Sequence, residues 1–528
     1  MRIAALLVGF VLTCRAGSPT LARSENLYSD LNDALAAIQT IDSGFSKVYG
    51  GRDRADWDRV YRRKLREMVG SLSRIETAGL PSTDAQAVAL MRAKVTSLSV
   101  ASSASATSHC KDAANDLSYA PLGKALYSCF DEVGGNLDFE GGKLNRLRVF
   151  DLLRSTDESA RRKALFLAMM PLWQAINGKN EPNSPYRRLI RLAAKPNASL
   201  SSAARTVGVD PALAESWMRQ ALETWQRVTG DRPIEPWDFD YQAGKADRIL
   251  SASIPRESLL PITERYYRDL GASLQQMGVL YDLDPRPGKS PVAYTDFASF
   301  GKLAGGVWRP SIPRISATYT HGGLSSLNEL VHETGHAIHI AAVHTRPAFM
   351  DLGDSLFVEA FADVASWNTY QPEWQQHYVG VAAAEPDSLR SLFSSVMMDI
   401  AWSLFEIRML RDPAADPNLV WTEITSRYLH IVPHPEWSWW AVRGQLVDSP
   451  GYMINYGLGA VLTADLRRHI RESLGPFETG DSRWYPWVSS RLLRYGLERD
   501  TVDLLREFLG RPVSPQALLA DLHRIALQ

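Results

Sequence analysis

The run from His332 to His336, with the sequence HETGH, brings together side chains that can hold a metal ion beside a base. Its two histidines are four residues apart, so on a helix they lie on one face and can direct two imidazole nitrogens at one metal ion. Glu333 follows the first histidine and is placed to take a proton from the attacking water in a hydrolysis. The run therefore predicts a zinc peptidase. The alternative is an ordinary helix with two structural histidines.

The residues around this run predict a helix that packs into the interior. Ser326 and Glu329 have the S-x-x-E spacing of a capping box, which places the start of the helix close to Ser326. Apolar residues follow at helical spacing, namely Leu327, Leu330, Val331, Ile338 and Ala341. We therefore expect both histidines on a helix with one face against the core.

A zinc peptidase needs a third protein ligand, and Glu359 is the best candidate. It follows His336 in an apolar stretch that predicts a second buried helix, which Asp354 or Ser355 could cap. Asp363 lies one turn beyond Glu359 and could hold the far ring nitrogen of a ligating histidine. Carboxylates inside an apolar helix are costly unless they are paired or bind metal. The alternative for both acids is a structural ion pair with a buried arginine.

Two other histidines could compete for the metal. His339 lies three residues after His336 and His344 lies further along the chain. A ligand as close as His339 would have to reach round its own helix. We therefore expect His339 to be a core or rim histidine.

Several segments beyond the HETGH run resemble one group of zinc peptidases. They are GGLSSLNELVHETGHAIH from Gly322, PWDFDY from Pro236, DLDPRPGKSPVAYTDF from Asp282 and SPGYMINYGLGAVLTADL from Ser449. Together they resemble the gluzincin peptidases of the thimet oligopeptidase and oligoendopeptidase F family, with angiotensin-converting enzyme as a more distant relative. The similarity extends from about Leu144 to the C-terminus.

This resemblance implies both a fold and an activity. The fold is mainly α, with two helical lobes around a deep channel and a small β-sheet next to the metal helix. The resemblance implies that His332, His336 and Glu359 bind Zn²⁺ and that Glu333 is the base. The implied reaction is zinc-dependent hydrolysis of short peptides. The alternatives are a carboxypeptidase or dipeptidyl carboxypeptidase on the same scaffold, and an inactive secreted helical binding protein.

The family also carries a tyrosine that donates a hydrogen bond to the oxyanion formed during hydrolysis. Tyr456 aligns best with it and Tyr452, one helical turn earlier, is the second candidate. Either tyrosine could instead serve only in packing. The relatives have a histidine upstream of that tyrosine, where this chain has Arg443, Gly444 and Gln445. Arg443 or Gln445 could take over its contact with the substrate.

The segment Pro313–Thr320, PRISATYT, alternates apolar and polar residues just before the metal helix and predicts a short strand. An exposed strand edge there could hold an extended peptide by main-chain hydrogen bonds. The alternative is an ordinary strand within a small sheet.

Composition fits a globular enzyme. The chain has 528 residues, of which 45% are hydrophobic, and its formal net charge is -1. Such a chain can bury a large core. It contains no basic run with interleaved aromatic residues, so nucleic acid is not an expected partner. Nothing in the sequence points to a particular oligomeric state.

The N-terminal residues predict export. Arg2 is followed by an apolar run from Ile3 to Thr13, and Thr20, Leu21 and Ala22 form a cleavage site, as in a secretory signal peptide. Cys14 raises the alternative of a lipoprotein, but its neighbours match a lipobox poorly. The apolar run is too short to span a bilayer, and no later stretch is long enough. A periplasmic or secreted protein is therefore expected.

Cleavage after Ala22 would leave two cysteines, Cys110 and Cys129, which we expect to form a disulfide bond in an exported protein. They lie in a Ser-, Ala- and Gly-rich stretch from Ser97 to Gly142 that predicts an irregular segment. The markers together divide the chain into a signal peptide at 1–22, an N-terminal helical region at 23–143, a helical channel wall at 144–232 and a catalytic region at 233–528.

Overall fold

The computed structural model describes most of the chain. The described residues are 19–45, 52–101, 110, 117–193, 198–230, 232–286, 289 and 292–525. The chain divides into two compact units. The N-terminal unit comprises the described parts of Met1–Ser105 together with Ala298–Arg309 and Thr345–Met350, and the main unit comprises those of Ala106–Phe297, Pro310–His344 and Asp351–Gln528. All the predicted site residues belong to the main unit.

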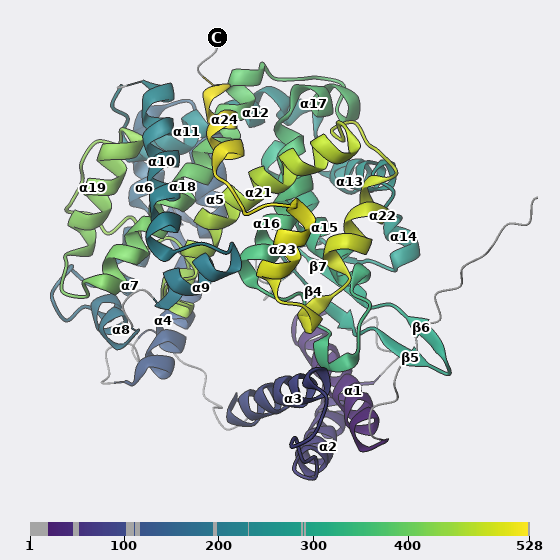
Figure 1. Ribbon diagram of the computed structural model, residues 1–528. Coiled ribbons are helices and arrows are strands. Elements are labelled where there is room, and N and C mark those ends of the chain that lie inside the picture. The colour runs from purple at the N-terminus through teal and green to yellow at the C-terminus, as the bar shows by residue number, and fades with distance from the viewer. Residues whose placement is uncertain are drawn as a thin grey trace, which may run out of the picture. The chain divides into compact units, whose positions relative to one another are not determined.

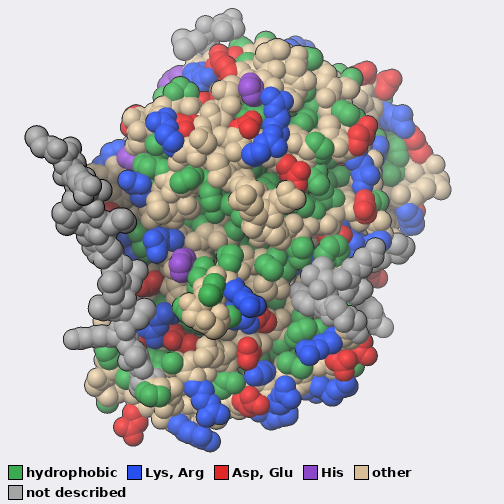
Figure 2. Space-filling view, turned by 90° about the vertical axis from the view of Figure 1, so that its right-hand side faces the viewer, with side chains coloured by type: hydrophobic (Ala, Val, Ile, Leu, Met, Phe, Trp, Pro, Cys, Tyr) green, Lys and Arg blue, Asp and Glu red, His purple; other side chains and the backbone are tan. Residues whose placement is uncertain are grey.

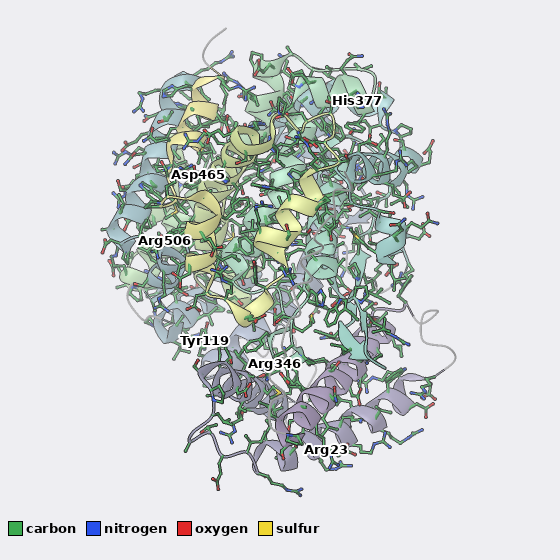
Figure 3. The ribbon with its side chains drawn as sticks, turned by 45° about the vertical axis from the view of Figure 1, so that its right-hand side comes forward. Arg23, Tyr119, Arg346, His377, Asp465 and Arg506 are labelled. Carbon is green, nitrogen blue, oxygen red and sulfur yellow. A yellow bond between two sulfur atoms is a disulfide. The ribbon has the colours of Figure 1, made fainter. Side chains whose placement is uncertain are left out.

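The N-terminal unit combines helices with a β-hairpin. Its elements are α1 (Pro19–Asp42), α2 (Arg54–Leu72), α3 (Ser82–Ala101), β5 (Lys302–Ala304) and β6 (Val307–Arg309). Asp53 caps α2 by accepting a hydrogen bond from the backbone N of Asp56 at 2.7 Å. Arg346, labelled in Figure 3, donates to Glu25 on α1 at 3.0 Å and to Asp84 on α3 at 2.7 Å. These ion pairs fix the segment around Arg346 within the unit.

The predicted processing site falls at the start of this unit. Thr20, Leu21 and Ala22 lie in the first turn of α1, where Leu21 is buried. The apolar run from Ile3 to Thr13 and Cys14 lie outside the described residues. Cleavage after Ala22 stays a prediction.

The main unit is mainly α-helical, as expected for this fold class. Its N-terminal half contains α4 (Tyr119–Gly134), α5 (Arg146–Ser155), α6 (Ser159–Leu167), α7 (Met170–Asn177), α8 (Pro185–Ala193), α9 (Ala198–Thr206), α10 (Pro211–Thr229), α11 (Pro236–Ala243), α12 (Lys245–Leu250), α13 (Leu259–Asp269) and α14 (Leu274–Met277). A two-stranded antiparallel pair, β1 (Leu137–Phe139) and β2 (Gly142–Leu144), follows α4.

The C-terminal half of the main unit holds the longest helices. Its elements are α15 (Leu324–Ala342), α16 (Ser355–Ser366), α17 (Pro372–Tyr378), α18 (Glu385–Arg411), α19 (Pro417–Leu429), α20 (Gln445–Asp448), α21 (Met453–Leu474), α22 (Trp484–Val488), α23 (Thr501–Leu509) and α24 (Gln516–His523). Asp465 on α21, labelled in Figure 3, is fully buried and accepts hydrogen bonds from Arg511 at 2.7 and 2.8 Å. This ion pair ties the C-terminal segment to α21.

A three-stranded sheet lies beside the metal helix. Its strands are β3 (Leu280–Asp282), β4 (Tyr294–Ser299) and β7 (Ile312–Ser316), in the order β3-β7-β4. β3 and β7 run parallel, with Leu280 opposite Arg314, and β7 packs against α15. β7 is therefore the middle strand, and the prediction that it offers an exposed edge to a peptide is wrong. Alternating polarity indicates a strand but does not indicate its position in a sheet.

The helices that carry the site pack closely on one another. α15 packs on α16, α16 packs on α21 and α21 packs on α18, and Figure 1 shows α15, α16 and α21 near one another at the centre of the main unit. A Cβ atom on Gly335 of α15 would lie 2.8 Å from Cα of Ala362 on α16. Glycine thus allows the backbones of α15 and α16 to approach within the HETGH run.

The start of α15 differs from the prediction. The helix begins at Leu324, after Gly323 with a φ of 101°, and the side chain of Asp247 accepts from the backbone N of Ser325 at 2.9 Å. The predicted capping box of Ser326 and Glu329 is therefore wrong, because Asp247 on another helix supplies the capping oxygen. The start of α16 follows the prediction, since Asp354 accepts from the backbone N of Leu356 at 2.9 Å.

The cysteine-bearing stretch is more regular than expected. Helix α4 occupies Tyr119–Gly134, and its apolar face includes the buried Leu122, Leu126 and Cys129. Cys129 is joined to Cys110 by a disulfide bond, as the sequence analysis expected. The irregular segment predicted from Ser97 to Gly142 is therefore wrong over α4, where the apolar spacing of a helix outweighs the glycine and serine content.

Charged side chains of both signs alternate over the visible surface. Figure 2 shows basic and acidic side chains interspersed on the face in view, with hydrophobic side chains between them. Within the described residues, no helix combines the length and the apolar character needed to cross a membrane.

Candidate metal centre and active site

The three predicted metal ligands converge on one point. Nε2 of His332 lies 3.1 Å from Nε2 of His336 and 3.4 Å from Oε2 of Glu359. Nε2 of His336 lies 3.8 Å from Oε2 of Glu359. The centre of that triangle lies about 2 Å from each corner, which is the length of a zinc bond to nitrogen or oxygen. Two imidazoles and one carboxylate are also a donor set that zinc accepts while keeping a further position open. The residues present therefore fit a zinc ion.

Asp363 orients the first of these histidines. Its Oδ1 lies 2.7 Å from Nδ1 of His332, and the hydroxyl of Ser366 donates to the same oxygen at 3.0 Å. A hydrogen bond at Nδ1 leaves the lone pair of Nε2 directed at the metal position. The structure thus puts Asp363 in the contact that its spacing from Glu359 predicted.

The electrostatics of the cluster follow from its burial and its carboxylates. Burial opposes the charged form of His332, but Asp363 and Glu359 outweigh burial and raise the pKa of His332 well above its usual value. Burial and the charge on His332 lower the pKa of His336. Burial raises the pKa of Glu359, but the two histidines outweigh burial and lower it. Glu359 is therefore held as a carboxylate, which is the form that binds a metal.

The predicted base, Glu333, is buried and held from the neighbouring strand. The hydroxyl of Thr295 on β4 donates to Oε2 of Glu333 at 2.7 Å and lies 2.9 Å from the backbone oxygen of the same residue. This contact fixes the direction of the carboxylate beside the metal ligands. Thr295 could not be predicted from the sequence, because only the fold brings β4 next to α15.

The two candidate tyrosines lie behind Glu359. The hydroxyl of Tyr452 donates to Oε1 of Glu359 at 3.1 Å, and the rings of Tyr452 and Tyr456 meet edge to face with centroids 5.6 Å apart. Burial, followed by the charge on Glu359, raises the pKa of each tyrosine well above its usual value. Both hydroxyls therefore stay protonated. Among the described residues, the Tyr456 hydroxyl has no hydrogen bond, whereas that of Tyr452 is engaged by a metal ligand.

The competing histidines lie outside the metal cluster. His339 is almost fully buried between the rings of Phe357 and Phe361, at centroid distances of 5.5 and 5.8 Å. Burial, followed by the charge on His336, lowers the pKa of His339 to about 3. His339 is thus a core histidine, as expected. The backbone N of His344 donates to the backbone oxygen of Arg494 at 2.9 Å, and its side chain is not part of the cluster.

A cavity of about 470 Å³ in the main unit opens onto the metal position, and His332 and Asp363 belong to its wall. The wall carries charges of both signs. The basic side chains are Arg146, Arg148, Arg154 and Arg443, and the acidic ones besides Asp363 are Asp151, Asp240, Glu329 and Asp399. Such a cavity is in the size range of sites for small ligands.

Two arginines on this wall lie near each other. Arg443 is hydrogen-bonded to Asp399 and its guanidinium lies 4.7 Å from the ring centroid of Trp402. Among the described residues, the hydrogen bond of the Arg146 side chain goes to the backbone oxygen of Val442, at 3.3 Å. Burial, followed by the charge on Arg443, lowers the pKa of Arg146 to about 10. Of the two residues expected to replace the family's histidine, Arg443 faces the cavity, whereas Gln445 is not among its described lining residues.

Glu406 fixes the entry to the tyrosine helix. It is fully buried on α18, and its two oxygens accept from the backbone N of Gly451 at 2.7 Å and of Met453 at 2.8 Å. Ser403 on the same helix donates to the backbone oxygen of Met453 at 2.6 Å. Burial raises the pKa of Glu406 to about 8. Glu406 was not among the predicted site residues, although an acid within the apolar run of α18 is a signal in the sequence.

Comparisons with known proteins bear on the fold. No protein-family model and no curated protein matches the chain. Solved structures do match it. Metallocarboxypeptidase 1 of Trypanosoma cruzi is 16% identical with a TM-score of 0.52, and the match covers 96% of this chain and 99% of that one. A carboxypeptidase of Pyrococcus furiosus is 14% identical with a TM-score of 0.54, over 97% of this chain and 100% of that one.

A third solved structure, a carboxypeptidase of Deinococcus radiodurans, gives the same result. It is 14% identical with a TM-score of 0.54, and the match covers 96% of this chain and 99% of that one. The chain has the fold of these carboxypeptidases. The finer resemblance to the thimet oligopeptidase and oligoendopeptidase F family stays a prediction.

Proposed function

We propose that this chain is a zinc-dependent peptidase whose metal is held by His332, His336 and Glu359. The observation that carries the proposal is the convergence of these three side chains on one helix-lined point, where His332 also belongs to the wall of the cavity. A zinc ion bound there would polarise the scissile carbonyl and make a water molecule more acidic. Side chains of this chain transfer the proton, orient the ligands and stabilise the oxyanion.

Glu333 acts as the base in this proposal. Its carboxylate, held by Thr295 at 2.7 Å, takes the proton of the attacking water and passes it to the leaving amine. Asp363 keeps His332 in the orientation that a metal ligand needs. Tyr456, with its hydroxyl free of hydrogen bonds among the described residues, is the preferred donor to the oxyanion, and Tyr452 is the second candidate.

Short peptides are the proposed substrates. The cavity of about 470 Å³ supports this, because it has room for a few residues of an extended chain but not for a folded protein. Hydrolysis within short peptides, as in an oligopeptidase, is the first candidate for the mode of attack.

Release of residues from the C-terminus is the second candidate. Arg146 lies on the cavity wall without an ion pair among the described residues, next to the charge of Arg443. An arginine in such a place can bind a carboxylate through two hydrogen bonds. The likeness in fold to structures named carboxypeptidases supports the same candidate.

Defined peptides of graded length separate these modes. The zinc-loaded protein is incubated with each peptide, with and without a chelator, and the products are sequenced. An oligopeptidase cuts internal bonds and still cuts a peptide with an amidated C-terminus. A carboxypeptidase releases single residues from the free C-terminus and loses most of its rate on the amide. No product from any peptide would contradict the proposed function and would favour an inactive binding protein.

The role of Glu333 is tested by Glu333→Gln. We expect this variant to bind zinc as the wild type does, because the ligands are intact, and to lose turnover by about a hundredfold to ten-thousandfold. Glu373→Gln, an exposed residue on α17, is the matched control and keeps both properties. Equal turnover of Glu333→Gln and wild type would contradict the assignment of the base.

We also propose that the protein is exported. The apolar run from Ile3 to Thr13 and the disulfide between Cys110 and Cys129 support this proposal. Fractionation of the producing cells, with N-terminal sequencing of the mature chain, tests export and cleavage after Ala22. Retention of palmitate on Cys14 would favour the lipoprotein alternative instead.

A further inference from the structure

Glu329 stands out among the acidic side chains of the cavity. It lies on α15, one helical turn before Glu333, and its carboxyl faces the cavity and is reached by water there. Among the described residues, no lysine, arginine or histidine forms an ion pair with it. The buried hydroxyl of Tyr319 lies near it and has no hydrogen bond among the described residues.

The other cavity carboxylates each have a cationic or histidine partner. Asp399 is bonded to Arg443, and Asp363 to His332. Arg154 serves two further acids, because Nη1 lies 4.0 Å from Asp151 and Nε lies 3.8 Å from Asp240.

The charged groups near Glu329 do not supply the positive charge that an ion pair would. Glu333 and Asp151 are both negative and lie near enough to disfavour its charged form, whereas Tyr319 and His332 act in the opposite sense. His321, which lies 3.5 Å from Asp151, is an exposed histidine that already faces a carboxylate. The local field therefore favours a positive group at this point of the cavity.

Glu329 is exposed to the cavity and, with two further carboxylates nearby, gives this part of the wall a negative potential that attracts a cation brought by a ligand. We propose that Glu329 is a specificity-determining residue, which binds a cationic group of the peptide substrate. The group is either the free amino terminus or the side chain of a lysine or arginine. This inference rests on the proposed peptidase function and adds the class of peptide that the cavity selects.

Matched pairs of peptides test the proposal. In the first pair, lysine at one position is replaced by Nε-acetyl-lysine, and this is repeated along the peptide. In the second pair, a free amino terminus is replaced by an acetylated one, with neutral side chains throughout. We expect the wild type to show a kcat/KM about fivefold higher for the cationic member of at least one pair, since a partly exposed ion pair contributes about 1 kcal/mol.

The ratio within each pair identifies Glu329 as the cause. In Glu329→Gln the ratio falls to about one, while Glu329→Asp keeps part of it, because the shorter carboxylate still carries the charge. Glu373→Gln is the surface control and keeps the wild-type ratio. A general loss of folding would lower both members of a pair and leave their ratio unchanged. The pair that responds shows whether the group is the amino terminus or a side chain.

Several outcomes would overturn the inference without touching the proposed function. A wild type that hydrolyses both members equally, or a Glu329→Gln variant that keeps the preference, would do so. If the zinc-loaded wild type hydrolyses no peptide, the proposed function fails. In that case, calorimetric titration of the same peptide pairs into wild type and Glu329→Gln measures whether Glu329 binds the cationic group. A cationic preference that the variant loses supports it, and equal or absent binding overturns it.

Discussion

The contact between α15 and α16 at Gly335 makes the sharpest prediction. In Gly335→Ala the new Cβ would lie 2.8 Å from Cα, 2.9 Å from O and 3.3 Å from C of Ala362. All three atoms belong to the backbone, so no side chain can rotate away. Carbon atoms sit comfortably at about 3.5–4.0 Å, so α16 would have to move by about 1 Å.

That movement would reach the metal site directly. Glu359 lies on α16 less than one helical turn before Ala362, and zinc ligands tolerate errors of only about 0.2 Å in their distances. We therefore expect Gly335→Ala to weaken zinc binding by about a hundredfold or more. Overpacking should also lower the free energy of unfolding by about 1–3 kcal/mol, less the roughly 1 kcal/mol by which alanine favours a helix over glycine.

The opposite face of α16 supplies a matched control. A Cβ on Gly459 of α21 would lie 3.7 Å from O of Leu356 and 3.9 Å from Cβ of Ala360, which are ordinary contacts. Gly459→Ala should keep zinc affinity and gain slightly in stability. Competition with a chromophoric chelator measures the affinity, and thermal denaturation of the zinc-free protein measures the stability. Zinc affinity within about threefold of wild type in Gly335→Ala, with an unchanged melting temperature, would refute the reasoning.

Four further variants test the surroundings of the site. Asp363→Asn should weaken zinc binding by about tenfold to a hundredfold, since it disturbs the hydrogen bond to His332, and chelator competition would detect this. Tyr456→Phe should lower kcat by about a hundredfold with little change in KM, because the hydroxyl of Tyr456 is the proposed donor to the oxyanion. A loss of kcat in Tyr452→Phe alone would assign the donor role to Tyr452. Burial raises the pKa of Glu406 to about 8 in the folded protein, whereas an unfolded chain releases this proton near pH ~4.3. Between these two pH values the folded protein holds a proton that the unfolded chain has lost. The free energy of unfolding therefore falls as the pH rises from about 4.3 to 8, by at most about 1.4 kcal/mol per pH unit. Urea denaturation should find a weaker pH dependence in Glu406→Gln, and identical slopes would contradict this.

The metal ligands were predictable because their signal is local. The spacing of His332 and His336 and the acids inside an apolar stretch each lie within one helix, and helical periodicity places them. Helical periodicity does not predict how the two helices lie relative to each other. Their approach depends on Gly335 meeting Ala362, which is a contact between backbones and leaves no pattern in either segment alone.

The residues that support the site were harder to foresee, because their contacts are distant in sequence. Thr295 reaches Glu333 only through the position of β4 in the sheet, and Asp247 caps α15 from a separate helix. The same cause explains the wrong prediction of a capping box, since Ser326 and Glu329 had the right spacing but the helix begins two residues earlier. A local pattern predicts that a helix exists more reliably than it predicts where the helix begins.

The separation of the site's parts along the chain bears on how it assembles during folding. His332 and Asp363 are 31 residues apart, whereas the contact between Tyr452 and Glu359 spans 93 residues. Closing the shorter loop costs less entropy, so α15 and α16 can pair before α21 docks. Zinc could therefore be captured by a chain that is still incompletely folded. The metal would then stabilise the pair of helices onto which the tyrosine helix later packs.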